Sequence, residues 1–265
     1  MSPTLQPELS PDGTRYAVVG DGPALICLHG LGLDHTMWAP QLARLSQSFR
    51  VVCVDLMGHG GSAAPRAGAR IEDFADQVLT LAEHLELTSF HVMGFDLGGQ
   101  VAIALAARSP ERTAGLALIS TAYRRLKPQR DMMLRRLKQA ENHGPEANAD
   151  SAIQRWFSAA FQTDHRELVD QVRQCIAGSD RTGYLIASEV YAWADVTTAD
   201  MLKHVNCPVL VMCGALDMGT TPDMARRLAA AISGAKLVIV PRQRHMLVME
   251  EPELVGGTVT GHLLG

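Results

Sequence analysis

Residues 93–99 read MGFDLGG, and this stretch decides the fold because it joins a short apolar run to a helix-patterned stretch through a tight turn. The apolar run, Phe90 to Met93, has the length and composition of a buried strand. Gly94 and Gly98 carry no Cβ, so a strained turn can close between strand and helix. A strand, a sharp turn and a helix in this order predict a nucleophile elbow with the side chain of Asp96 at its tip.

The rest of the chain repeats this alternation of short apolar runs and helix-patterned stretches. We expect helical crossovers at Ile71 to Leu85, Gly99 to Arg108 and Pro222 to Ile232, where apolar residues recur at helical spacing. The expected strands are Ala24 to Leu28, Val51 to Asp55, Phe90 to Met93, Gly115 to Ile119, Val209 to Cys213 and Lys236 to Val240. The sequence therefore predicts an α/β fold with a doubly wound, mostly parallel sheet.

Residues 123–204 break this alternation. They contain the amphipathic helical patterns MMLRRLKQAENHG, SAIQRWFSAAF and ELVDQVRQCIAG, with no strand between them. We therefore predict a core domain built from residues 1–122 and 205–265, with a helical cap inserted at residues 123–204.

Composition limits the kinds of partner that we expect. The chain has 265 residues, of which 47% are apolar, enough for one large domain. The net charge of -4 is spread over both signs, which argues against nucleic acid or an anionic membrane surface as partner and favours a neutral or modestly polar small molecule. The oligomeric state is left open.

The cysteines and the N-terminal stretch indicate a cytoplasmic protein. None of the five cysteines forms a C-x-x-C pair, so we expect reduced thiols. The N-terminal MSPTLQPELSPDGTRY lacks the apolar core of a signal peptide, and no run of the chain approaches the roughly 18 apolar residues of a membrane span.

Two further strand ends carry groups suited to catalysis. Asp217 ends the stretch GALD, directly after an expected strand, and His245 comes just after the last expected strand. Both side chains would then lie at the same sheet edge as Asp96. We predict Asp96 as nucleophile, Asp217 as the acid that orients the base, and His245 as the base.

The stretch LHGLG, residues 28–32, follows the first expected core strand. Its position predicts that the backbone N–H groups of Leu31 and Leu97 form an oxyanion hole. We interpret His29 mainly as a structural residue of this turn. The expected substrate pocket between cap and sheet is lined by His29, Gly30, Tyr123, Trp156, Tyr184, Tyr191 and Trp193.

Neither a metal nor a cofactor is expected. Histidines do not occur in pairs four residues apart on an expected helix, and cysteines and histidines do not cluster at ligand spacing. The glycine-rich GHGGS lacks both the dinucleotide-binding pattern and the lysine of a phosphate-binding loop.

From Leu25 to Gly265 the chain resembles the α/β-hydrolases, in particular the small ester and enol-lactone hydrolases. The resemblance rests on LHGLG, VDLMGHGGS, GFDLGGQVA, GALDMGTTP and RHMLVMEEP. It implies the same fold, a catalytic triad in the order found here, and a purely structural turn at Asp55 and His59. The chain departs from these hydrolases at one catalytic position, where they carry serine and this sequence carries Asp96.

Aspartate nucleophiles occur in the related epoxide hydrolases and haloalkane dehalogenases. This chain differs from the former at Gly32, where they carry proline, and from the latter at Leu31 and Leu97, where they hold halide. Epoxide hydrolases also need phenol donors, which Tyr123, Tyr184 or Tyr191 would supply.

Three hypotheses follow. The first is a hydrolase of a small, largely apolar ester or lactone, which uses the triad of Asp96, His245 and Asp217. The second is an epoxide hydrolase or dehalogenase, in which Asp96 forms an alkyl-enzyme ester that water activated by His245 opens. The third is a ligand-binding relative that has lost turnover through replacement of its serine.

Overall fold

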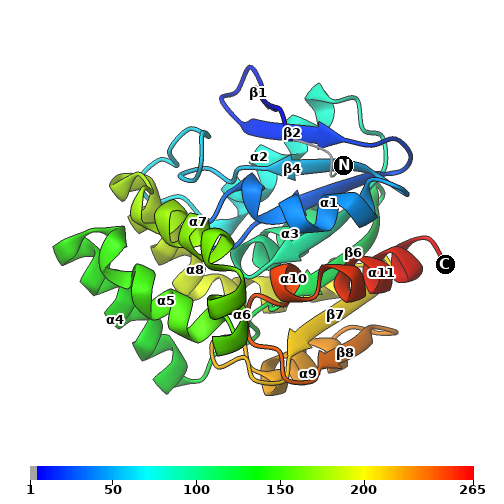
Figure 1. Ribbon diagram of the computed structural model, residues 1–265. Coiled ribbons are helices and arrows are strands. Elements are labelled where there is room, and N and C mark those ends of the chain that lie inside the picture. Colours follow the sequence, from blue (N-terminus) through cyan, green and yellow to red (C-terminus); the bar gives the residue numbers. More distant parts are fainter. Residues whose placement is uncertain (1–4) are drawn as a thin grey trace.

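The computed structural model describes residues 5–265, and its centre is one eight-stranded sheet (Figure 1). Residues 1–4 begin both the expected core domain and the N-terminal stretch discussed above, and they lie outside the described residues. The strand order is β1-β2-β4-β3-β5-β6-β7-β8. The strands are β1 (Pro7–Leu9), β2 (Arg15–Val19), β3 (Ala24–Leu28), β4 (Arg50–Val54), β5 (Phe90–Phe95), β6 (Thr113–Ile119), β7 (Val209–Gly214) and β8 (Lys236–Val240).

The six expected strands are all present, and they pair in parallel from β4 to β8. The mostly parallel sheet is therefore confirmed. Strands β1 and β2 were not expected, and they add an antiparallel edge next to β4. Strand β1, PEL, is short and fully exposed, so no apolar run marks it. Strand β2, RYAVV, does contain the apolar run YAVV, a strand signal that could have been recognised.

Alternation of side chains along each strand divides the interior into two cores. On β3, Ile26 and Leu28 belong to one core, and Leu25 and Cys27 belong to the other. The first core is covered by α2 (Ile71–His84), α3 (Leu97–Arg108) and α9 (Pro222–Ala230). The second is covered by α1 (Ala39–Leu45), α10 (Leu247–Glu250) and α11 (Pro252–Leu263). Helices on both faces bury the sheet, as the apolar strands require.

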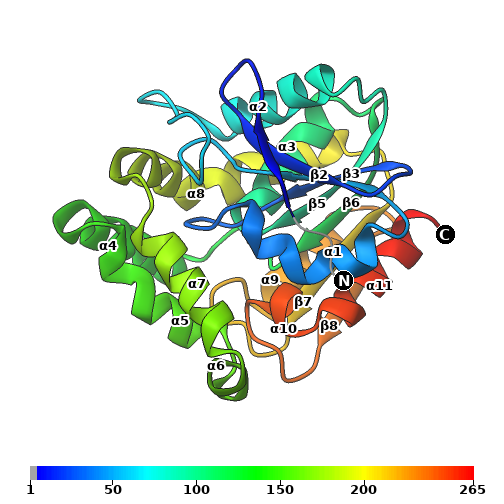
Figure 2. The same cartoon turned by 45° about the horizontal axis from the view of Figure 1, so that its top comes forward.

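Between β6 and β7 the chain is helical, and no strand interrupts it. The α-helices are α4 (Lys127–His143), α5 (Ala149–Trp156), α6 (Ala159–Asp164), α7 (Arg166–Ala177) and α8 (Arg181–Met201). Figure 2 shows α4 to α7 gathered at one side of the sheet. The pattern SAIQRWFSAAF forms two helices instead of one, because Ser158 caps α6 by accepting the N–H of Phe161.

Within residues 5–265, no helix has both the length and the hydropathy that crossing a membrane requires.

Candidate active site

Asp96 stands at a sharp turn between β5 and α3. Its backbone adopts φ 54° and ψ -108°, a strained conformation for a residue with a side chain. The turn is possible because glycines stand on either side of it. A Cβ on Gly94 would lie 2.4 Å from the carbonyl oxygen of Gly98, and one on Gly98 would lie 2.1 Å from that of Leu28. The geometry is that of a nucleophile elbow.

The two carboxylate oxygens of Asp96 have different surroundings. Oδ2 accepts a hydrogen bond from the backbone N–H of Leu31, with a distance of 3.2 Å. Oδ1 accepts one from the hydroxyl of Tyr191 and lies 3.7 Å from Nε2 of His245. One oxygen is thus held by backbone, while the other faces a phenol and an imidazole.

His245 is fixed from its other side by Asp217. Nδ1 of His245 lies 2.7 Å from Oδ2 of Asp217. The second carboxylate oxygen accepts the N–H groups of Gly219 and Thr220, and the Thr220 hydroxyl donates to Oδ2 at 2.6 Å. These bonds hold Asp217 in the orientation that directs Nε2 of His245 toward Asp96.

Burial and charge shift the pKa values of His245 and Asp217 in opposite directions. Burial by itself lowers the pKa of His245, but the charge of Asp217, the hydrogen bond to it and the charge of Asp96 raise that pKa above its ordinary value. Burial likewise opposes ionisation of Asp217, yet His245 and the hydrogen bonds from Thr220 lower the pKa of this carboxyl. The pair is therefore suited to hold a proton on the imidazole.

Replacing Asp217 by asparagine is expected to lower the pKa of His245, because the charge that counters burial is lost. The titration of the His245 imidazole, followed by NMR in the wild-type and Asp217→Asn proteins, measures this change. Asp223→Asn, a change of an exposed carboxylate, serves as the control and should leave the pKa of His245 unchanged. An unchanged His245 pKa in Asp217→Asn would contradict the assigned role of Asp217.

Tyr191 is held in place by a buried ion pair. The Arg125 guanidinium lies over its ring, 4.3 Å from the centroid, and is paired with Asp195 at 2.9 Å. Arg130 contacts the same carboxylate at 3.1 Å. Burial is the main cause that raises the pKa of Tyr191 well above its ordinary value. The phenol thus keeps its proton and acts as a hydrogen-bond donor to Asp96.

A cavity of about 100 Å³ opens over these groups. A single water takes up roughly 10–15 Å³ of such a cavity, so the space suits a small organic molecule. Its lining from the sheet side includes Leu31, Asp96, Asp217 and His245, and from the helical segment Arg125, Arg136, Arg155, Trp156, Tyr184 and Tyr191. With three arginines, this lining is less apolar than expected from the sequence.

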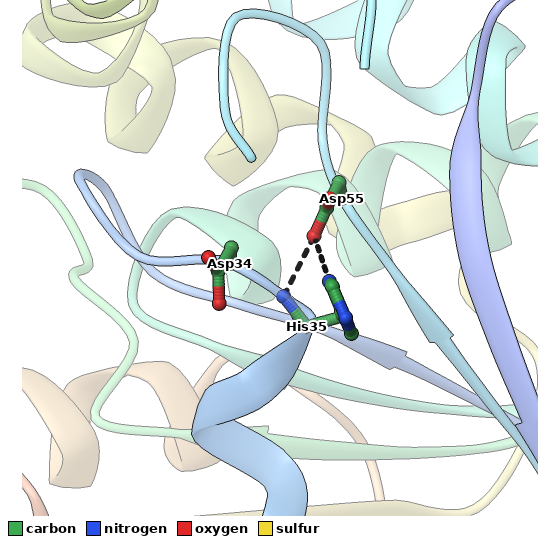
Figure 3. Close-up of side chains that lie close together, drawn as sticks. All are labelled: Asp34, His35 and Asp55. Atoms are coloured by element: carbon green, nitrogen blue, oxygen red, sulfur yellow. Dashed lines mark hydrogen bonds and ion pairs between the residues drawn. The ribbon is translucent and has the colours of Figure 1, made fainter. Parts of the chain in front are cut away.

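Asp34, His35 and Asp55 form the group within residues 5–265 whose side chains are spaced like metal ligands (Figure 3). Oδ1 of Asp55 already accepts the backbone N–H and Nδ1 of His35, both at 2.7 Å, and Oδ2 accepts the N–H of Gly61. Asp34 accepts the N–H of Thr36 at the start of a short helix. These bonds tie the end of β4 to the turn before α1, so the group has a structural explanation.

The elbow, the strand ends and the sheet order have counterparts in known proteins. Residues 23–252 match the family model of the α/β-hydrolase fold. The chain belongs to the α/β-hydrolase fold family. It is 31% identical to 3-oxoadipate enol-lactonase 2 of Acinetobacter baylyi, over 90% of this chain and 88% of the relative. It is 30% identical to the carboxylesterase YbfK of Bacillus subtilis, over 92% and 81%. The crystal structure of the enol-lactonase from Burkholderia xenovorans LB400 superposes with a TM-score of 0.89 at 32% identity, over 96% of this chain and 98% of that one.

In this α/β-hydrolase, four residues expected in the pocket lie elsewhere. His29 is fully buried in its turn, where its ring bonds the carbonyl of Gly30 and the N–H of Leu56. Gly30 packs against the Phe95 ring, which a Cβ would approach to 2.9 Å. These placements correct the expectation, because the ring and the glycine build the elbow region and leave no surface for the cavity.

Tyr123 and Trp193 are corrected for different reasons. Tyr123 is buried in the first core, and its ring lies under Arg124. Trp193 is 52% exposed on the outside of α8, where the Arg130 guanidinium lies 4.6 Å from its ring centroid. Trp156, Tyr184 and Tyr191 do line the cavity of this α/β-hydrolase.

Several residues of the site were missed. Thr220 had a partial signal, because an aspartate often accepts the backbone N–H two residues later, and the turn that Asp217 forms in this way with Gly219 brings Thr220 to the same carboxylate. Arg125, Arg136, Arg155 and Asp195 had none, since charged residues in amphipathic helical patterns normally face solvent. Only the packing of the helical segment of this α/β-hydrolase brings them to the site.

Proposed function

We propose that this protein hydrolyses a small ester or lactone through a covalent intermediate on Asp96. The observation that carries the proposal is the unequal environment of its two carboxylate oxygens, with Oδ2 on the Leu31 N–H and Oδ1 facing Tyr191 and His245. The names of the relatives, an enol-lactonase and a carboxylesterase, support the bond class. We further propose that the helical segment of residues 123–204 acts as the cap that covers this site.

In the first step, Oδ1 of Asp96 attacks the carbonyl carbon, and the bond to the leaving oxygen breaks. The leaving oxygen takes the proton from Nε2 of protonated His245, and the acyl group stays on Asp96 as an anhydride. An ester releases its alcohol at this step, whereas an opened lactone keeps its new hydroxyl or enol on the bound acyl group. The Tyr191 hydroxyl, which donates to Oδ1 at rest, donates to the carbonyl oxygen as that oxygen gains charge.

In the second step, neutral His245 takes a proton from water, and the hydroxide attacks Cγ of Asp96. The charge then develops on Oδ2, to which the Leu31 N–H already donates. We assign the Leu97 N–H, at the start of α3, as the second donor of this oxyanion hole. Cleavage of the bond between Cγ and Oδ1 releases the product acid with Oδ1, and Asp96 regains its carboxylate with one oxygen from water.

The charge of Asp96 lets His245 serve both steps. While Asp96 is ionised, its charge adds to that of Asp217 in raising the pKa of His245, which favours the protonated imidazole needed to release the leaving group. Acylation removes the charge of Asp96, so the pKa of His245 falls and the imidazole becomes available as a base.

A single turnover in water enriched in ¹⁸O tests this route. With p-nitrophenyl acetate as substrate and enzyme in excess, the peptide that contains Asp96 is expected to gain one labelled oxygen, as detected by mass spectrometry. The peptide that contains Asp223 serves as the internal control and should gain none. Complete turnover with the label only in the released acid would contradict attack at Cγ of Asp96.

The Tyr191 contact favours one second candidate, the opening of an epoxide. Attack of Oδ1 on a ring carbon would form an alkyl ester of Asp96, and the Tyr191 hydroxyl, beside that oxygen, would protonate the leaving ring oxygen. Turnover of an aryl epoxide with none of an ester or enol-lactone would select this candidate.

A further inference from the structure

The polar partners of the His245 ring lie at one of its two nitrogens. Nδ1 is 2.7 Å from Oδ2 of Asp217 and 3.2 Å from the Thr220 hydroxyl oxygen. Nε2 stands 3.7 Å from Oδ1 of Asp96, which is beyond hydrogen-bond distance. Contacts at a single atom hold one corner of the imidazole and leave the ring free to pivot about that corner. The tilt of the ring, which decides where Nε2 points, therefore has to be held by packing.

Two aromatic rings supply this packing. The ring of Phe95, the last residue of β5, has its centroid 4.8 Å from that of the His245 imidazole. Trp156 is the last residue of α5, and its indole centroid lies 5.6 Å from the imidazole, with the two planes inclined by 33°. Both separations fall in the range of attractive contacts between aromatic rings. Trp156 also lines the cavity, so one side chain contacts both the imidazole and the space for the substrate.

The chain around the indole is bonded to the loop that carries the imidazole. The Arg244 guanidinium donates to the carbonyl oxygen of Gln154 at 2.6 Å and to that of Phe157 at 3.1 Å. The N–H of Met246 donates to the carbonyl oxygen of Trp156 itself at 3.1 Å. The residues directly before and after the histidine thus both hold the end of α5.

A carboxylate adds a further link between the two segments. Glu250, at the end of α10, accepts the backbone N–H of Ser158 at 2.9 Å on one oxygen and the Ser158 hydroxyl at 2.5 Å on the other. Hydrogen bonds to an ionised acceptor are stronger than those between neutral groups. Residues 154–158 and 244–250 therefore form one bonded unit, in which a shift of α5 would move the imidazole as well.

We infer that Trp156 is a positioning residue for His245, so that the helical segment, and not only Asp217, sets the place of Nε2 above Asp96. The inference rests on the proposed function, because that function gives His245 both proton transfers. Misplacement of a reacting group by about 1 Å can cost roughly 100-fold in rate, so loss of this contact is expected to slow the chemical step.

The kinetics of p-nitrophenyl acetate hydrolysis test the role of the indole. Trp156→Leu is expected to lower kcat by roughly 10–100-fold, because the tilt of the imidazole is no longer held. Trp156→Phe keeps an aromatic ring and should bring kcat back to within about fivefold of wild type. Melting curves followed by circular dichroism establish that both variants are folded at the assay temperature. A folded Trp156→Leu protein with kcat within about twofold of wild type would overturn the inference.

A variant outside the cavity separates positioning from substrate binding. Arg244→Met removes the donors to the end of α5 and leaves the lining of the cavity intact, so kcat should fall roughly tenfold while KM stays within about twofold of wild type. Arg242→Met is the matched control, because Arg242 is exposed in the same loop, and both constants should stay within about twofold of wild type. An unchanged kcat in Arg244→Met would overturn the inference.

NMR decides the position of the imidazole without turnover. The ring current of the indole shifts the signals of the His245 imidazole protons, which are identified by their loss in His245→Gln. These signals should move in Trp156→Leu and in Arg244→Met and stay in place in Arg242→Met. Unchanged signals in the first two variants would overturn the inference, even in a protein that hydrolyses esters. Signals that move in a protein that hydrolyses neither ester nor lactone would remove the proposed function and leave the packing of His245 on Trp156.

Discussion

Replacement of Asp96 by alanine is expected to reduce hydrolysis of p-nitrophenyl acetate or an enol-lactone by roughly 10⁴-fold or more, as seen when other hydrolases lose a nucleophile. The reason is that the variant lacks the carboxylate that lies 3.7 Å from Nε2 of His245 and accepts the hydrogen bond of the Tyr191 hydroxyl. Initial rates of the wild-type and Asp96→Ala proteins measure the loss.

Two further variants separate the role of the nucleophile from that of the fold. Asp96→Asn keeps the shape of the side chain and should be as inactive as Asp96→Ala, because an amide is a poor nucleophile. Asp96→Ser should recover part of the ester hydrolysis, since a serine hydroxyl can be activated by the same His245. Activity of Asp96→Ala within about tenfold of wild type would instead assign the chemistry to water activated by His245 alone.

The fold could be predicted from the sequence because its signals are local. Buried parallel strands are continuous apolar runs, and Val209 to Cys213 or Ala24 to Leu28 stand out against the polar segments around them. Antiparallel β1 was missed because all its residues are exposed, so no hydrophobic pattern marks it. Because the ends of parallel strands meet at one edge of the sheet, the sequence could predict that Asp96, Asp217 and His245 lie close together, and the structure brings them together.

The rest of the cavity was not predictable, because it depends on how helices pack. Arg136 and the exposed Arg135 are neighbours in sequence with the same charge, and only the packing of α4 against α8 decides which one faces the cavity. The aromatic residues show the same limit. Tyr191 and Trp193 are two positions apart on α8, which is about 200° around a helix, so one reaches Asp96 and the other faces solvent.

Replacement of Asp195 by alanine is expected to have the largest effect on stability, a loss of about 3–5 kcal/mol. The Asp195 carboxylate is fully buried and contacts both Arg125 and Arg130, and it also accepts the backbone N–H of Arg125. Without it, two cations remain close together in the interior with no counter-charge. Thermal unfolding followed by circular dichroism should show a melting temperature lower by roughly 10 °C or more.

Asp200→Ala is the matched control, because Asp200 lies on the same helix and pairs with Arg124 at 3.8 Å in an exposed position. The expected loss of folding stability in Asp200→Ala is below about 0.5 kcal/mol.

The loss of stability caused by Asp195→Ala should also depend on pH. Burial opposes ionisation, but Arg125 and Arg130 lower the pKa of Asp195 below its ordinary value of 3.8, so the stabilisation is complete above that value and is lost as the pH falls through the lowered pKa. The difference in stability between wild type and Asp195→Ala should therefore become smaller as the pH falls. A difference that stays constant down to the pH at which the protein unfolds would contradict this prediction. Packing, and not the ion pair, would then hold Arg125 over Tyr191.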